Sequence, residues 1–299
     1  MAPRTSLSVT SLASLDQSSS CRLGFVGCGT IAVAIATGLA TQNAVTVEHV
    51  AVSRRSAAKS AALQAQFPYL VSVHDDNQAV VDASDVIFLT VLPTQVAQVL
   101  GQIKLDPTRH VLISLVSTAS LADLQEAASD LPSSSIFRMI CLPSVAVHSG
   151  VCLMTPPAAT DSLLHNLLDT LGGVVPAQTE DNFRALMVPS GLMGSFYALL
   201  RQNRDYVMQH GGLDGAQATV MVGKWYESMV RDVLERVEDN ENEDKSRALD
   251  DLIAEQTPGG LNEQGIVNLT KLGVWEAYGK VQSALHDRIA GKSDGSLSS

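Results

Sequence analysis

A glycine-rich loop near the start of the chain has the residue types and spacing that bind phosphate groups. Gly27, Gly29 and Ala32 form a G-x-G-x-x-A pattern that follows an apolar run and opens a helix-like segment. The first glycine permits a tight turn, the second lets the backbone approach a pyrophosphate, and the small third residue allows close helix packing. The start of the helix offers unpaired N–H groups to the phosphates. We therefore expect a dinucleotide here, bound by Gly27, Gly29, Thr30 and Ile31.

The residues after the second apolar run indicate which dinucleotide binds. A cofactor without a 2′-phosphate is usually held by Asp or Glu about 20 residues past the glycines. This chain instead places Ser53, Arg54, Arg55 and Ser56 there. Guanidinium and hydroxyl groups suit a 2′-phosphate, which a carboxylate would repel. The sequence therefore predicts NADPH as the cofactor, and a basic surface turn is the alternative interpretation.

A second pair of glycines could bind a different anion. Gln256-Thr257-Pro258-Gly259-Gly260-Leu261-Asn262 separates two helix-like segments. Successive backbone N–H groups at a Gly-Gly turn that enters a helix form a nest suited to a carboxylate. A plain turn between two helices would explain the Pro-Gly-Gly run equally well, and this alternative stays open.

The elements that must position these residues alternate between strand-like and helix-like segments. Such alternation predicts a parallel sheet with helices on both faces. The predicted strands are residues 23–27, 45–52, 86–91, 111–115 and 136–142, and the helices between them are residues 31–39, 57–66, 96–103 and 121–128. From residue 161 onward the signals are almost only helical, over residues 163–171, 191–210, 213–237, 246–255, 263–272 and 274–289.

The predicted fold class is α/β, a Rossmann-like doubly wound parallel sheet followed by an all-α dimerisation domain. The doubled proline at 156–157 marks the boundary between the two parts. We expect a disordered tail at 1–20, an NADP-binding domain at 21–156, a helical dimerisation and substrate domain at 157–290 and a polar tail at 291–299. An acidic run at 238–244 is interpreted as a solvated loop.

Composition excludes several classes of function. The 299 residues carry a formal net charge of −11, which disfavours a nucleic-acid partner. No apolar stretch approaches the roughly 20 residues that span a bilayer, so we expect a soluble protein without a membrane partner. Four cysteines without a C-x-x-C pair indicate reduced thiols and a cytoplasmic location. The seven histidines lack metal-ligand spacing, and no metal site is predicted.

From Arg22 to about Ile289 the chain resembles the pyrroline-5-carboxylate reductase family. The resemblance rests on the glycine loop, on residues 53–56, on the Pro-Gly-Gly turn and on two further segments. Residues 74–77 resemble the segment that brings an Asn, here Asn77, near the adenosine. Residues 85–93 resemble the strand that ends beside the nicotinamide ribose, which implies cofactor contacts for Val91, Leu92 and Pro93.

The resemblance also implies a substrate and an assembly. The substrate would be a small cyclic imine acid whose carboxylate is held at Gly259, Gly260, Leu261 and Asn262, with Asn262 as the catalytic candidate and Ser190 as a second polar contact. The implied assembly is a homodimer, or a larger homo-oligomer, with intertwined helical domains.

The substrate end departs from the family pattern more than the cofactor end. Leu92 stands where a Lys is usual, Leu142 replaces an Asn near the nicotinamide, and Asn262 replaces the Thr of the nest. Residues 117–118 and 190–195 also differ from the small-residue segments of the family. The sequence thus predicts a divergent member.

Three readings of the function follow. The first is NADPH-dependent reduction of 1-pyrroline-5-carboxylate to L-proline, and the second is reduction of a related cyclic imine such as piperideine carboxylate. The third is a non-catalytic NADP(H)-binding sensor. A β-hydroxyacid dehydrogenase is disfavoured because its catalytic Lys would fall at Leu200, which leaves no base for an alcohol proton.

Overall fold

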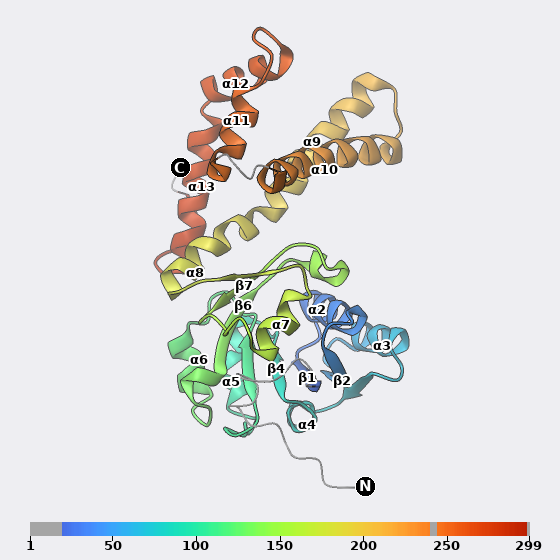
Figure 1. The fold of residues 1–299 in the computed structure, drawn as a ribbon, viewed down its shortest axis with the longest axis vertical. Helices are drawn as coiled ribbons and strands as arrows, with labels where there is room; N and C mark the ends of the chain where they lie inside the picture. The colour runs from blue at the N-terminus through green and yellow to red at the C-terminus, as the bar shows by residue number, and fades with distance from the viewer. Residues whose placement is uncertain (1–19, 240–243, 298–299) are drawn as a thin grey trace. The chain divides into compact units, whose positions relative to one another are not determined.

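The computed structural model describes residues 20–239 and 244–297 and divides into two compact units (Figure 1). The first unit runs to Ser190 and includes His286–Asp294, and the second holds Gly191–Leu285 and the residues from Gly295. The predicted tail at 1–20 lies outside the described residues except for Ser20. Residues 240–243 of the acidic run and 298–299 of the polar tail lie outside them as well.

The first unit is built on one eight-stranded sheet with the order β3-β2-β1-β4-β5-β6-β7-β8. Every neighbouring pair is parallel except β6 and β7. The strands are β1 (Ser20–Val26), β2 (Thr46–Ser53), β3 (Val71–His74), β4 (Val86–Leu89), β5 (Val111–Ser114), β6 (Ile136–Ile140), β7 (Cys152–Thr155) and β8 (Val174–Pro176). The predicted fold class, a doubly wound sheet followed by helices, is confirmed.

Helices cover both faces of this sheet. They are α2 (Thr30–Thr41), α3 (Ala57–Gln66), α4 (Asn77–Asp82), α5 (Val96–Leu100), α6 (Leu121–Ala127), α7 (Leu163–Asp169) and α8 (Glu180–Met187). Alternate residues of β4 show the two layers, because Phe88 belongs to one buried cluster and Ile87 and Leu89 belong to another. Phe88 stacks on Phe25 of β1 with the ring centroids 4.7 Å apart. Strands buried on both faces explain the continuous apolar runs in the sequence.

The sheet extends beyond the boundary predicted at residue 156. β7 pairs antiparallel with β6, β8 adds to β7 in parallel, and α8 packs on this edge through Phe183 and Met187. The compact first unit therefore continues to Ser190. Sequence reasoning missed β3, β7 and β8, which are short and lack the run of branched apolar residues that marks the equally short β4 and β5.

The second unit contains the helices α9 (Met193–Gly211), α10 (Gly215–Asp239), α11 (Ala248–Ala254), α12 (Leu261–Lys271) and most of α13 (Val274–Ile289). α9 and α10 pack as a hairpin, with Phe196 edge-on to Tyr226 at 6.0 Å between ring centroids. Arg236 of α10 forms a two-bonded ion pair with Glu255 after α11, at 2.7 and 2.6 Å. The apolar side chains buried among its described residues are those of Leu192, Ala218, Val222 and Ala248.

Candidate cofactor and substrate sites

The predicted phosphate loop follows β1 and is fixed by hydroxyl groups from two neighbouring strands. Gly27 has φ +96°, and a Cβ there would lie 2.7 Å from the carbonyl oxygen of Thr90. Its N–H donates to Ser53 Oγ at 2.9 Å, and its carbonyl accepts from Thr90 Oγ1 at 2.9 Å. Only glycine fits this conformation and this contact without strain. Ser53, predicted as a cofactor contact, thus also holds the loop.

The second glycine stands where a dinucleotide would approach. Gly29 is the N-cap of α2, its backbone is extended, and a Cβ there would meet nothing within 4 Å in the described structure. No side chain caps this helix end, and its first turn carries no acidic residue. Thr30 and Ile31 open the helix, so their N–H groups lack partners within it. This helix end is suited to an anion.

Lys59 adds a positive charge at the same helix end. Its Nζ donates to Thr30 Oγ1 at 2.7 Å from the exposed face of α3. A cation beside the N-terminus of a helix is unfavourable unless an anion lies between them. The position of Lys59 therefore fits a bound phosphate better than an empty helix end.

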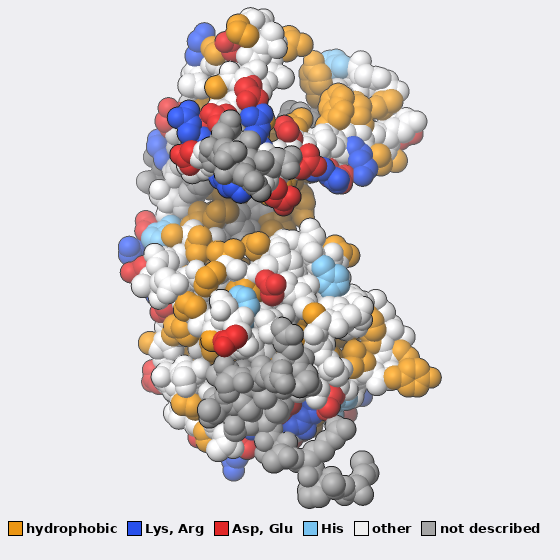
Figure 2. Space-filling view, viewed as in Figure 1, with side chains coloured by type: hydrophobic (Ala, Val, Ile, Leu, Met, Phe, Trp, Pro, Cys, Tyr) orange, Lys and Arg blue, Asp and Glu red, His pale blue; other side chains and the backbone are white. Residues whose placement is uncertain are grey.

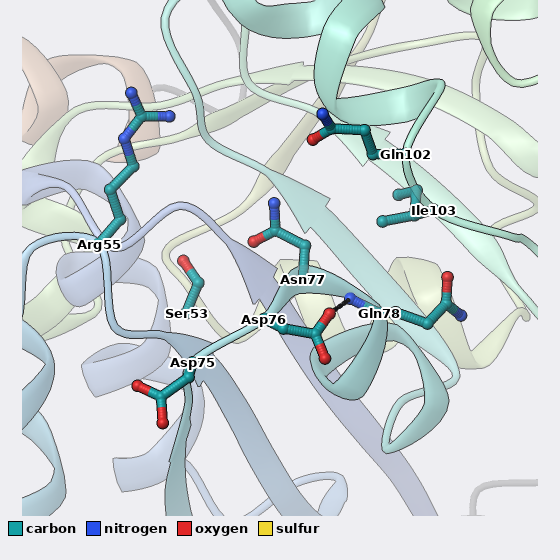
Figure 3. Close-up of a pocket in the computed structure, with 8 residues that line it drawn as sticks. All are labelled: Ser53, Arg55, Asp75, Asp76, Asn77, Gln78, Gln102 and Ile103. Atoms are coloured by element: carbon teal, nitrogen blue, oxygen red, sulfur yellow. Dashed lines mark hydrogen bonds between the residues drawn. The ribbon is translucent and has the colours of Figure 1, made fainter.

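Several residues predicted to contact the cofactor line one hollow of about 480 Å³ at the ends of β2 and β3. Ser53, Arg55 and Asn77 belong to its wall, and Figure 3 shows them rising from neighbouring loops. The other lining residues are Asp75, Asp76, Gln78, Gln102 and Ile103. The hollow thus brings together a guanidinium, a hydroxyl and an amide, which suits the phosphorylated ribose of NADPH.

Arg54 behaves differently from Arg55. Its Nε lies 2.5 Å from Asp75 Oδ1, in an ion pair between two exposed side chains. Asp76 caps α4 by accepting the Gln78 N–H at 2.7 Å. The hollow therefore contains carboxylates as well as cations, which the spacing of the basic residues did not indicate.

The residues predicted beside the nicotinamide ribose follow β4. Val91 is half-buried, Leu92 is 64% exposed, and Pro93 begins the 3₁₀ helix η1 (Pro93–Gln95). Leu92 N–H donates to Gln95 Oε1 at 3.3 Å. Leu142 follows β6 and is also exposed. Two apolar side chains thus reach solvent at the carboxyl edge of the sheet.

The predicted carboxylate nest forms the turn into α12. Gly259 has φ +73°, and Gly260 is the N-cap of α12. The Gly260 N–H donates to the Thr257 carbonyl at 2.8 Å, and the Gly259 N–H donates to Glu263 Oε2 at 2.6 Å. Both glycine N–H groups therefore already have acceptors within the chain. Leu261 and Asn262 form the first turn, where their N–H groups have no partner within the helix.

Ser190 belongs to the first unit, whereas the turn at Gly259 belongs to the second. It lies in the 3₁₀ helix η4 (Val188–Leu192), and its hydroxyl donates to the Met187 carbonyl at 2.7 Å. The joint role of Ser190 and the turn stays a prediction.

Sequence reasoning missed Thr90, Lys59, Asp75 and Glu263 at these sites. Lys59 lies on a helix that was predicted correctly, but its contact with Thr30 crosses 29 residues of chain. Glu263 could have been found, because an acidic residue three positions after an N-cap glycine commonly bonds backward to the turn.

The four cysteines are buried within the first unit. Burial raises the pKa of the Cys28 thiol, against the opposing effect of Lys59, so this residue stays protonated at neutral pH. All four cysteines are buried and free. Within residues 20–239 and 244–297, His, Cys, Asp and Glu side chains form no group of three that could hold a metal ion.

Comparisons with known proteins agree with this geometry. The family described as NADP oxidoreductase coenzyme F420-dependent matches residues 22–118, which include the phosphate loop and the hollow. A pyrroline-5-carboxylate reductase from Synechocystis sp. is 25% identical over 275 residues, which cover 90% of this chain and 97% of that protein. The chain is therefore similar to pyrroline-5-carboxylate reductases over most of its length, at low sequence identity.

Further proteins similar to this chain are also named pyrroline-5-carboxylate reductases. Pyrroline-5-carboxylate reductase 3 of Danio rerio is 30% identical over 106 residues, which are 35% of this chain and 36% of that protein. The solved pyrroline carboxylate reductase of Plasmodium falciparum, with NADP bound, has a TM-score of 0.73 at 19% identity and covers 92% of this chain and 98% of its own. The Streptococcus pyogenes enzyme has a TM-score of 0.71 at 18% identity and covers 90% and 98%.

The family model and the curated relatives support an oxidoreductase with a Rossmann-type fold, and the solved Plasmodium falciparum neighbour has NADP bound. They also support a small-molecule substrate, whose identity they leave open at this level of identity.

One apolar helical stretch differs from the sequence prediction, which found none long enough to span a bilayer. Among the described residues, Glu180–Gly211 is long and apolar enough to cross a membrane, with a mean hydropathy of 1.3. Length and composition alone are weak evidence for a span.

Proposed function

We propose that this chain is an NADPH-dependent reductase of a cyclic imine, with 1-pyrroline-5-carboxylate, reduced to L-proline, as the first substrate to test. The observation that carries the proposal is the open N-terminus of α2, with Gly29 facing free space and Lys59 beside Thr30. A helix end arranged in this way needs an anion. The family name of the relatives supplies the substrate class.

The cofactor contacts divide along the dinucleotide. N–H groups of Gly29, Thr30 and Ile31 would bind the pyrophosphate, with Lys59 as a counter-charge. Arg55, Ser53 and Asn77 would hold the phosphorylated ribose in the 480 Å³ hollow. Val91, Leu92 and Pro93 would border the nicotinamide ribose after β4.

Imine reduction asks the protein chiefly for alignment. Bound NADPH supplies the hydride, and a protonated C=N group is already a strong electrophile, so proximity matters more than a strong acid or base. Asn262 in the first turn of α12 would orient the substrate and hold a water that supplies the proton of the protonated imine. Ser190 keeps acceptor capacity on its oxygen because its hydrogen is donated to Met187.

The second unit indicates a partner of the same kind. Large apolar side chains on α9, α10, α12 and α13 are exposed, among them Phe196, Trp225, Leu234, Leu269 and Trp275. Figure 2 shows hydrophobic side chains, in orange, over the α9–α10 hairpin and around α12. Since monomers rarely expose so much apolar surface, we propose that a second copy covers it. Light scattering should give at least a dimer.

The buried, free cysteines favour a cytoplasmic location.

The test is to follow NADPH absorbance with purified protein and two substrates, 1-pyrroline-5-carboxylate and piperideine carboxylate. Oxidation with the first supports proline formation, and oxidation with the second alone supports a related imine. Binding of NADPH without turnover of either would overturn the reductase and favour a sensor. Absence of NADPH binding would contradict the cofactor assignment as well.

A further inference from the structure

The turn before α12 holds a carboxylate of its own at the place where a substrate carboxylate was expected. Glu263 lies in the first turn of α12, and its Oε2 accepts the Gly259 N–H at 2.6 Å. The next N–H, that of Gly260, donates to the Thr257 carbonyl at 2.8 Å. Both glycine donors of the predicted nest are therefore used within the chain.

The charge of this helix end also opposes a second carboxylate. A negative side chain near a helix N-terminus is stabilising, because the exposed N–H groups carry partial positive charge. Glu263 already supplies that negative charge. A substrate carboxylate would have to displace Glu263 from Gly259, or bind to the remaining N–H groups beside a like charge.

The other side chains at this turn are poor partners for an anion as well. Leu261 is 86% exposed and presents an apolar side chain at the start of the helix. Among the described residues of the turn and first turn, 257–263, no Lys or Arg is present to offset Glu263. Asn262 remains as a neutral donor and acceptor.

We infer that Glu263 sets the substrate preference of this enzyme and lets it reduce cyclic imines that lack the ring carboxylate about as well as those that carry it. This inference rests on the proposed reductase function and narrows its substrate class. The chemistry is the same on either ring. A hydride adds to the imine carbon, a proton ends on nitrogen, and NADPH is oxidised to NADP⁺. What Glu263 changes is the affinity for the acid.

A matched pair of substrates tests the inference directly. 1-Pyrroline and 1-pyrroline-5-carboxylate share the reacting C=N group and differ only in the carboxylate. We expect the wild-type protein to reduce the two substrates with kcat/KM values within about tenfold of each other. A preference for the acid of several decades would overturn the inference.

Glu263→Gln removes the charge and keeps an oxygen that can accept the Gly259 N–H. We expect this variant to have a kcat/KM for 1-pyrroline-5-carboxylate about tenfold higher than wild type, because KM falls. Its kcat/KM for 1-pyrroline should stay within about twofold of the wild-type value. Glu276→Gln is the matched control, because Glu276 is the acidic residue in the first turn of α13. Glu276→Gln should leave kcat/KM for both substrates unchanged.

The outcomes separate this inference from the proposed function. If neither ring is reduced while NADPH binds, the reductase proposal fails. If both rings are reduced and Glu263→Gln changes them equally, or changes neither, the role of Glu263 is overturned. Glu263→Ala, which also removes the bond to Gly259, serves as a second variant. Thermal melting of each variant checks that α12 remains folded.

Discussion

The helix N-termini of α2 and α12 follow similar glycine turns and differ in their charge. At α2, Gly29 faces open space, the first turn has no acidic residue, and the cation of Lys59 contacts Thr30. At α12, the acidic Glu263 accepts the Gly259 N–H. One helix end therefore lacks an anion, and the other already has one.

This difference shows what a glycine motif does and does not specify. Glycines set the backbone path, as the positive φ values of Gly27 and Gly259 show. The neighbouring charges decide which ligand can use the N–H groups that the path exposes. At α2 those charges favour a phosphate, and at α12 they disfavour a carboxylate.

The largest expected effect separates the two glycines of the phosphate loop. Gly27→Ala places a Cβ 2.7 Å from the Thr90 carbonyl at a positive φ, a strain of about 1–3 kcal/mol or more. We expect a lower melting temperature and loss of NADPH binding, measured by nucleotide fluorescence. Gly29→Ala should weaken NADPH binding with an unchanged melting temperature, because its Cβ meets only open space. Equal melting temperatures for the two variants would contradict the predicted clash between the Cβ at position 27 and the Thr90 carbonyl.

Acid should weaken the first unit through His110. Burial, and then the charge of Arg109, lower the pKa of this 1% exposed histidine to about 4. The unfolded chain binds the proton more readily, so stability is complete above about pH 6.5 and falls as the pH drops toward 4, by about 3 kcal/mol in total. Urea unfolding at several pH values should show this slope, and His110→Asn should reduce it. A slope that survives the substitution would assign it to other groups.

Arg55→Ala should test the phosphate side of the comparison. We expect NADPH to bind about 10- to 100-fold more weakly, the loss of a charged hydrogen bond, while NADH is unchanged. Arg247→Ala, an exposed arginine near the start of α11, is the control. An equal loss for NADH would place Arg55 away from the 2′-phosphate.

Asp75→Asn should have the smallest effect and the opposite sign. It frees Arg54 from its ion pair with Asp75 and removes a negative charge from the wall of the hollow, so we expect NADPH to bind up to about tenfold more tightly. Asp130→Asn, a distant exposed carboxylate, controls for net charge. Weaker NADPH binding would mean that the ion pair shapes the hollow instead of competing for the phosphate.

The sequence predicted the central strands and the cofactor loop because their signals are local. The continuous apolar run of β4 and the glycines after β1 are visible without any tertiary contact. The end of the first unit was not predictable in this way, since β8 has three residues and depends on pairing with β7. Asp75 and Lys59 escaped notice because their partners, Arg54 and Thr30, are brought near by the sheet and not by spacing.

Gly27 has a mechanical consequence. Its N–H donates to Ser53 of β2 and its carbonyl accepts from Thr90, which follows β4, so this one residue connects the two strands that flank β1. In the proposed binding mode the adenosine would lie at β2 and the nicotinamide at β4. Gly27 thus couples the positions of the two strands. A shift of either strand would move this residue and change the distance that a bound dinucleotide has to span.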